Sequence, residues 1–369
     1  MSGNRWEHVV GQERAVALLQ RAAERPVHAY LLVGPRGSGT DEAARCFAAA
    51  VLAPDDDRVW DLARRGRHPD IVEIDPADNQ IRVEHAQEII DEAYSSPVEG
   101  ARKAIIVFEA ERLNETAANR LLKTLEEPPA SAVIVLVTSG ADQLLATICS
   151  RCQRVDFAHL APATIRDVLT GSGVTAERAD LMARLAGGRL DRARALDGPL
   201  AGVRDAFVAA ATALDGTGSA VAMWVASVQD AMQEANNDLE LAQRAEMEAL
   251  TEELDRAGYS PRIARAQLKR LADQQKRAHR HARTELLIEG ITALETVYRD
   301  ALASSVDQAL NVDRPVLQVE PRGAAHALDA CRAARQALAE FNPNETLLLE
   351  RLFLHLPGTT TGRRPRRDR

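Results

Sequence analysis

The sequence predicts an α/β domain with a parallel sheet, followed by a small helical lid and an all-α domain. Three observations lead to this prediction. Short β-branched runs alternate with helical segments over the first 160 residues, which is typical of βαβ units. A glycine-rich loop, GPRGSGTD at residues 34–41, joins the first of these runs to a helix. Beyond about residue 201, strand patterns vanish and helical periodicity dominates.

The predicted strands are short apolar runs bounded by polar or proline-containing segments. HAYLLVG places the first strand at residues 29–33, and other runs follow at 71–74, 104–108 and 132–137. A last strand near RVDFAHL, residues 154–160, closes the domain around residue 160. Helices are predicted at residues 11–24, 83–96 and 115–127, with a further helix directly after the glycine-rich loop.

The second half of the chain has a helical pattern with two charged stretches. Residues 230–255 hold nine acidic side chains and one basic one, and residues 262–283 hold eight Arg or Lys and one acid. Two solvated helix faces, a charge-complementary helix pair or a subunit-facing surface would each give this pattern. Four basic residues share one helix face because they recur every seven positions: Arg262, Lys269, Lys276 and Arg283. Residues 358–369 form a basic tail that we expect to be disordered.

Composition narrows the possible functions. The 369 residues suffice for two or three domains. A net charge of −8 leaves any nucleic-acid contact to local basic patches. Four cysteines are too few for a disulfide framework and fit a reducing compartment. The start, MSGNRWEHVV, has no apolar signal core, and no run reaches the roughly 18 apolar residues of a membrane span. We therefore expect a cytoplasmic protein with no membrane partner.

The glycine-rich loop matches the phosphate-binding pattern G-x-x-x-x-G-K-[ST] only in part. Gly34 and Gly39 occupy the glycine positions, with Gly37 between them. Thr40 stands in place of the lysine, and Asp41 in place of the hydroxyl that binds Mg²⁺. Thr40 offers no charge to the β- and γ-phosphates, and Asp41 adds a negative group beside them, although a carboxylate could in principle hold a metal ion. Because the backbone amides and the helix N-terminus remain, the loop is predicted to keep its shape without productive ATP binding.

A second nucleotide-binding element is altered as well. P-loop ATPases carry an Asp at the end of a buried strand to hold Mg²⁺, often followed by Glu. In KAIIVFEAERL, Glu109 takes the Glu position and Phe108 replaces the Asp. Chance sequence change or misalignment would explain one altered nucleotide-binding element. Two altered elements favour a protein that keeps the ATPase fold but has lost ATP hydrolysis.

The segment LNETAANRLLKTLEEPPASAVIVLVTSGADQLLATICSRCQRVDF, residues 113–157, resembles clamp-loader subunits of bacterial DNA polymerase III, which are members of the AAA+ superfamily. Upstream, VVGQERAV, HAYLLVGPRGSG and HPDIVEID fit the same family in order. The helical half resembles the family's oligomerising collar more loosely. The resemblance implies an AAA+ domain with a degenerate P-loop over residues 1–160, a helical lid over 161–200 and a collar over 201–357.

Within this family, the missing lysine points to a member that does not hydrolyse ATP. The resemblance implies a hetero-pentameric ring with gamma/tau and delta subunits, which places the sliding clamp on primed DNA. ATP and Mg²⁺ are then expected in the neighbouring subunit, and no cofactor is expected in this chain. Many relatives carry four zinc-ligand cysteines in the region that corresponds to residues 53–68, and this chain has none there, so zinc is not expected either.

The triplet Ser150-Arg151-Cys152 carries the group expected to act on a neighbour. In this family its arginine reaches into the adjacent ATP site, where a guanidinium offsets the charge of the γ-phosphate. A surface ion pair is the ordinary alternative for a lone arginine. Lys123 is expected either to contact a neighbour's phosphates or to be solvated. Arg192, in GGRLDRARAL, matches the family's sensor-2 arginine, and we expect a structural role for it.

Cys149 and Cys152 form a C-x-x-C pair that could be half of a zinc site or a redox pair. Because no second C-x-x-C exists, we expect small buried residues that flank the arginine. Two other functions stay open. One is an ATP-hydrolysing clamp-loader subunit that resembles gamma/tau, and the other is a stand-alone AAA+ DNA-binding regulator. The residues that touch DNA are not identified by the sequence.

Overall fold

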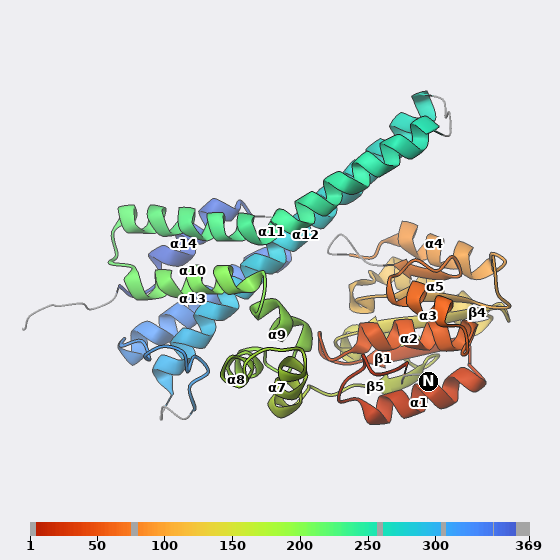
Figure 1. The fold of residues 1–369 in the computed structure, drawn as a ribbon, viewed down its shortest axis with the longest axis horizontal. Helices are drawn as coiled ribbons and strands as arrows, with labels where there is room; N and C mark the ends of the chain where they lie inside the picture. The colour runs from red at the N-terminus through yellow and green to blue at the C-terminus, as the bar shows by residue number, and fades with distance from the viewer. Residues whose placement is uncertain (1–4, 75–79, 257–260, 304–307, 342, 359–369) are drawn as a thin grey trace, which may run out of the picture. The chain divides into compact units, whose positions relative to one another are not determined.

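Figure 1 shows the fold of the chain in a computed structural model, which describes residues 5–74, 80–256, 261–303, 308–341 and 343–358. The chain divides into two compact units, unit 1 over Met1–Ala193 and unit 2 over Arg194–Arg369. The three-way division expected from the sequence is finer than this and stays a prediction. The expected basic tail lies outside the described residues from residue 359 onward.

Unit 1 contains a five-stranded parallel sheet in the order β2-β3-β4-β1-β5. The strands are β1 (Ala29–Val33), β2 (Ile71–Ile74), β3 (Lys103–Val107), β4 (Ala132–Thr138) and β5 (Gln153–Asp156). β1 lies between β4 and β5, so that Val33 pairs with Thr138 on one side and with Asp156 on the other. The predicted parallel sheet is confirmed. Helices bury both faces of a parallel sheet, so its strands are apolar on both sides. This is why continuous apolar runs in the sequence marked the strands.

Helices cover both faces of this sheet. One face is covered by α1 (Glu13–Glu24), α2 (Thr40–Leu52) and α3 (Asp57–Arg64). The other is covered by α4 (Val83–Tyr94) and α5 (Glu115–Glu126). Leu19, Phe47 and Trp60 belong to the first apolar layer, and Ile89 and Leu121 to the second. Unit 1 therefore folds as three layers, with the glycine-rich loop at one end of β1.

Short elements complete unit 1 after the sheet strands. They are the 3-10 turns η1 (Ala110–Arg112) and η2 (Ala141–Gln143) and the helices α6 (Ala146–Cys149), α7 (Pro162–Gly171), α8 (Ala176–Leu185) and α9 (Leu190–Leu196). α7 and α8 pack against each other. α9 begins in unit 1 and ends in unit 2.

Unit 2 consists of helices. They are α10 (Leu200–Ala213), α11 (Gly218–Arg256), α12 (Pro261–Leu302), α13 (Pro321–Glu340) and α14 (Glu345–Leu354). Phe207 and Phe353 meet edge to face in the core, with ring centroids 6.0 Å apart. Gly290 lets α12 approach α10 closely, because a Cβ there would lie 2.1 Å from the Phe207 ring.

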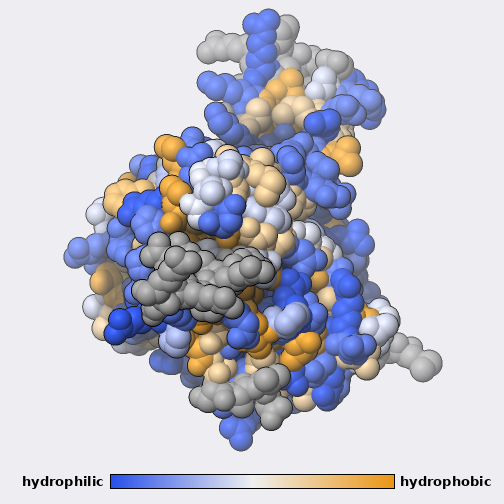
Figure 2. Space-filling model, turned by 90° about the vertical axis from the view of Figure 1, so that its left-hand side faces the viewer, coloured by the Kyte–Doolittle hydropathy of each residue, from blue (hydrophilic) through white to orange (hydrophobic). Residues whose placement is uncertain are grey.

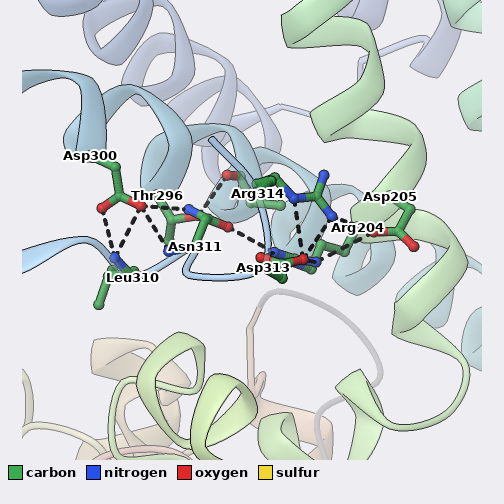
Figure 3. Close-up of polar contacts among 9 residues, drawn as sticks. Arg204, Asp205, Thr296, Asp300, Leu310, Asn311, Asp313 and Arg314 are labelled. Carbon is green, nitrogen blue, oxygen red and sulfur yellow. Dashed lines mark hydrogen bonds and ion pairs between the residues drawn. The ribbon is translucent and has the colours of Figure 1, made fainter. Parts of the chain in front are cut away.

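A polar network ties the segment after α12 to α10 and α12 (Figure 3). Arg204 of α10 donates two hydrogen bonds of 3.0 Å to Asp313 and one of 2.8 Å to Asn311. Asp300 of α12 accepts hydrogen bonds from the backbone N–H groups of Leu310 and Asn311. These bonds replace the water that the buried groups lose on folding.

α11 and α12 form a long hairpin whose far end extends beyond the other helices of unit 2 (Figure 1). Across it, Gln275 Nε2 donates to the carbonyl oxygen of Gln243 at 2.8 Å. No ion pair among the described side chains joins the acidic stretch of α11 to the basic stretch of α12. Arg244 pairs with Glu240 on its own helix at 3.6 Å. Direct ion pairs therefore do not join the described side chains of the two stretches, and the three explanations expected from the sequence stay open. Within the described ranges, no helix has both the length and the apolar character needed to cross a membrane.

Candidate functional site

The glycine-rich loop joins β1 to α2 at the carboxyl ends of the parallel strands, the edge of an α/β sheet at which ligands bind. Gly37 and Gly39 take positive φ angles of 69° and 93°, which other residues rarely adopt. At Gly34, a Cβ would lie 2.6 Å from Cβ of Phe157. The amide of Gly34 donates to the carbonyl oxygen of Thr138 at 3.0 Å. Each of the three glycines is therefore required by the loop's backbone or by its neighbours.

Thr40 and Asp41 begin α2, at the positions of the lysine and of the metal-binding hydroxyl. Thr40 is buried, and its hydroxyl donates to Asp41 Oδ1 at 3.3 Å. Asp41 keeps an exposed surface, but burial of its carboxyl raises the pKa to about 6, and the neighbouring charge of Glu42 adds to the shift. At neutral pH this carboxyl is mostly ionised. The carboxylate of Asp41 therefore places a negative charge where the negatively charged phosphates of a nucleotide would lie.

The first turn of α9 contacts the loop within unit 1. The amide of Leu190 donates to the carbonyl oxygen of Gly37 at 3.2 Å. Asp191 Oδ1 lies 1.8 Å from the point that a Cβ on Gly37 would occupy. Burial alone would raise the pKa of Asp191, but hydrogen bonds from Arg189 hold it below its ordinary value. An ionised carboxylate therefore lies against the loop and opposes the approach of a phosphate. Arg192 is half-buried in the same turn and has a polar contact within the chain.

The end of β3 differs from a metal-binding strand end. Phe108 is 6% exposed, and the guanidinium of Arg45 lies over its ring at 5.0 Å from the centroid, a cation–π distance. Glu73 accepts two hydrogen bonds of 2.8 Å from Arg45 and so fixes it there. An apolar ring and a cation thus occupy the position of the Mg²⁺-binding carboxylate, and the cation would repel a metal ion.

Glu109 follows Phe108 and is held by two arginines. Its carboxylate forms ion pairs with Arg36 of the glycine-rich loop and with Arg112, the latter at 2.9 Å. Its backbone is left-handed, with φ of 47°, which costs about 1–3 kcal/mol and persists only where the surroundings fix it. The carboxylate is therefore engaged by guanidinium groups rather than open to orient a water molecule. The contribution of Arg36 was not predicted, because no pattern links the loop to the end of β3.

Arg151 lies between α6 and β5, where its guanidinium contacts α5. Its Nε donates to Oε1 of Glu126 at 2.9 Å, and Nη2 binds the same oxygen. Nη1 donates to the carbonyl oxygen of Thr147 at 2.8 Å. Lys123 is exposed and shares a face of α5 with Glu126, since the two are three residues apart. The structure thus places both predicted trans-acting residues next to Glu126, a carboxylate in the TLEEPP segment that was not predicted to matter.

Cys149 and Cys152 flank this arginine as free, half-buried thiols. Burial raises the pKa of Cys152 to about 12, so this thiol stays protonated and unreactive at neutral pH. Both pack against the apolar layer under α4 and α5. Among the residues that the structure describes, no group of three or more His, Cys, Asp or Glu side chains is placed to bind a metal ion.

Comparisons with known proteins agree on one family for the N-terminal part. The family model described as "DNA polymerase III, delta subunit" matches residues 11–161. The chain is 39% identical over 171 residues to DNA polymerase III subunit tau of Bacillus subtilis, covering 44% of this chain and 30% of that protein. It is 33% identical over 183 residues to subunit delta' of the same organism, covering 47% and 56%. The chain therefore spans about half or less of the length of these two relatives.

Among solved structures, the chain is similar to a DNA polymerase III gamma subunit-related protein from Thermotoga maritima. The sequence identity is 21% and the TM-score is 0.49, with 92% of this chain and 98% of that chain covered.

Proposed function

Residues 11–161 belong to the AAA+ clamp-loader family of bacterial DNA polymerase III, and from this premise we propose that the chain is a non-hydrolysing subunit of the delta-prime type. In this proposal it scaffolds a hetero-pentameric ring with gamma/tau and delta subunits in the cytoplasm. It supplies Arg151 to the ATP site of its neighbour while the sliding clamp is placed on primed DNA. As a component of the DNA-directed DNA polymerase III holoenzyme, it would have no ATPase activity of its own.

The observation that carries the proposal is at the end of β3, beside the glycine-rich loop. There the two positions at which an active ATPase has free carboxylates are filled by other groups. Hydrolysis requires a cation at the β- and γ-phosphates and a carboxylate that holds Mg²⁺. Here Phe108 takes the carboxylate position and lies against the guanidinium of Arg45. Glu109 is engaged by Arg36 of the loop itself. Neither the metal nor the attacking water has a free carboxylate at these positions.

The surroundings of Arg151 support its role in trans. Its side chain is 32% exposed, and that of its partner Glu126 is 49% exposed. Exposed ion pairs contribute only about 0–1 kcal/mol. A triphosphate of a neighbouring subunit carries more charge than one carboxylate, so it can displace Glu126 from the guanidinium.

Substitution of Arg151 tests the proposal directly. In a complex reconstituted with the other subunits, Arg151→Ala should leave assembly intact and slow hydrolysis at the one site that Arg151 completes by about 10³-fold. The readouts are gel filtration of the complex, DNA-stimulated ATPase activity and clamp loading. Arg154→Ala is the matched control, because Arg154 is a nearby exposed arginine on β5 that pairs with Asp156. Unchanged turnover in a verified complex with Arg151→Ala would remove Arg151 from this role.

The greater identity to subunit tau, 39% against 33% for subunit delta', favours one alternative, an ATP-hydrolysing subunit of the gamma/tau type. ATPase activity of the isolated chain decides between the two. We expect none for the wild type, and none for Thr40→Lys, because the added lysine leaves Phe108 and the Arg36–Glu109 pair in place. Hydrolysis by the isolated wild-type chain would favour the alternative. If Thr40→Lys hydrolyses ATP strongly while the wild type does not, the end of β3 still supports hydrolysis despite Phe108 and the Arg36–Glu109 pair.

A further inference from the structure

The outer half of α12 presents four exposed cations along one line. These residues, called the basic stripe below, are Arg265, Lys269, Lys276 and Arg280. At 100° per residue they fall within an arc of about 60° on the helix, and at 1.5 Å per residue they span about 22 Å. The stripe differs from the seven-residue repeat expected from the sequence, because Arg283 leaves that line to bind Glu345 of α14 at 2.7 Å. The side chain of Arg262, another member of that repeat, lies outside the described part of the structure.

The basic stripe has no partner within the described part of the chain. None of its four side chains forms a hydrogen bond or ion pair with another described residue. The seam with α11 runs along a different face of α12, which carries the half-buried residues Leu268, Leu271 and Gln275. In Figure 2 the part of the projecting hairpin that is coloured, at the top, shows hydrophilic side chains around a smaller apolar strip. Among the described side chains, the four charges are therefore exposed and make no bond across the hairpin.

The composition of the basic stripe favours nucleic acid over protein as its partner. Protein interfaces are built around aromatic, Met and Arg side chains and are depleted in Lys. The stripe offers two Lys, two Arg and the exposed Ala272 between them, without an apolar anchor. A duplex carries about one negative charge per 1.7 Å of its axis, so a straight helix with cations about 6–10 Å apart can lie along it.

We propose that the outer half of the α11–α12 hairpin binds the phosphate backbone of double-stranded DNA through the basic stripe. Because the chain as a whole is acidic, with a net charge of −8, attraction to DNA comes from local basic segments such as this face, and it depends strongly on salt. Exposed carboxylates of α11, such as Glu248 and Glu252, repel a duplex from the other helix and so orient it on α12. The choice of DNA over RNA rests on the proposed function. The phosphate contact requires neither the ring nor ATP.

The test measures binding of the full chain to a labelled 30-base-pair DNA duplex by fluorescence anisotropy at 50–200 mM KCl. Four phosphate contacts contribute about 0.9 each to the slope of log K against log salt. Replacing all four stripe residues with Gln should therefore lower the slope by about 3.6. Over this fourfold salt range the wild type should lose about 10²-fold more affinity than the variant. Circular dichroism and thermal melting verify that the variant is folded.

A matched control removes four exposed arginines from unit 1 and gives the same change in net charge: Arg14, Arg21, Arg25 and Arg67, each replaced by Gln. This control should keep the wild-type slope, and so should Arg265→Lys combined with Arg280→Lys, which keeps the charge. An unchanged slope in the stripe variant would overturn the proposal, as would an equal loss in the unit 1 control. Polyglutamate is the competing acidic polypeptide. If it displaces the duplex at equal charge concentration, the stripe is a surface for an acidic protein instead. ATPase activity has no part in these outcomes, so they are independent of the test on Arg151.

Discussion

Arg204 in unit 2 and Arg151 in unit 1 both bind carboxylates, but their surroundings are opposite. The side chain of Arg204 is 10% exposed and makes two hydrogen bonds of 3.0 Å to Asp313 and one of 2.8 Å to Asn311 (Figure 3). Arg151 is 32% exposed and binds one oxygen of Glu126, which is itself half exposed. Water can replace Glu126 at little cost, whereas Asn311 is buried and Asp313 is only 27% exposed, so water replaces the partners of Arg204 less readily.

This difference separates an arginine that belongs to the fold from one that, in the proposed function, is available to a partner. Arg204 joins residues 109 positions apart in the sequence, so its bonds fix the segment after α12 to α10. Arg314 extends the same network to Asp205 at 3.0 Å. Arg151, by contrast, bonds to Glu126 and to the carbonyl oxygen of Thr147 on its own turn. Burial, and not residue type, decides which guanidinium can exchange its carboxylate for a phosphate.

The largest effect on stability is expected from Arg204→Met. Removing one partner of a buried pair costs about 3–5 kcal/mol, and because Asp313 is 27% exposed we expect about 2–3 kcal/mol here. Urea unfolding followed by circular dichroism measures this change. In the same assay Arg151→Ala should change the free energy of unfolding by less than about 1 kcal/mol. Asp313→Leu added to Arg204→Met should restore part of the loss, since no charge is then left unpaired. Equal effects of Arg204→Met and Arg151→Ala would break the comparison.

A smaller, catalytic effect is expected from Glu126→Gln. The neutral amide no longer competes with a γ-phosphate for Arg151. An exposed pair contributes up to about 1 kcal/mol, so DNA-stimulated hydrolysis at the one site that Arg151 completes should rise about two- to fivefold. Glu127→Gln, at the next exposed position, is the control. With Arg151→Ala in the background, Glu126→Gln should have no effect. A fall in activity would mean that Glu126 positions the arginine instead of restraining it.

The sheet of unit 1 could be predicted from the sequence because its signals are local. The first strand was expected at residues 29–33 and forms at Ala29–Val33, and the helix expected at residues 83–96 forms at Val83–Tyr94. α3 was not predicted, although Asp56 accepts hydrogen bonds from two of its amides and caps its start. The charged residues of that segment conceal the short apolar face formed by Val59, Trp60 and Ala63. The length of the hairpin was not predicted either, because charge patterns indicate exposed faces and not the position at which a helix ends.

The candidate site could be predicted only in the residues that a motif marks. Thr40, Asp41, Phe108 and Glu109 were singled out by comparison with phosphate-loop patterns. The groups that surround them were not, because they come from other segments of the chain. Arg36 and Glu109 are 73 positions apart. Glu126 likewise meets Arg151 only because α5 and α6 pack against each other on the same face of the sheet.

The pKa values of two carboxylates, Asp313 in unit 2 and Asp41 in unit 1, differ in the same way as the two arginines do. Burial would raise the pKa of Asp313, but hydrogen bonds from Arg204 and Arg314 hold it below its ordinary value. Burial raises the pKa of Asp41 to about 6, and the more distant charges of Arg45 and Arg36 oppose the shift only in part. Carboxyl-carbon NMR titration should find Asp41 titrating near pH 6 and Asp313 below its ordinary range.

The smallest expected effect is that of Asp41→Asn on stability against pH. Because the pKa of Asp41 is higher in the folded than in the unfolded chain, the folded state binds the extra proton between about pH 4 and pH 6. This group therefore lowers the free energy of unfolding as the pH rises through that window, and the loss persists at pH 7. Asp41→Asn should melt about 1–2 °C above the wild type at pH 7 and level with it at pH 4, because the partly exposed carboxyl is screened by water. Asp313 has the opposite sign: its contribution is present above about pH 4 and is lost as the pH falls through its lowered folded-state pKa. If Asp41→Asn instead destabilises the chain at pH 7, the carboxylate favours the start of α2 more than burial disfavours it, and the contrast with Asp313 does not hold.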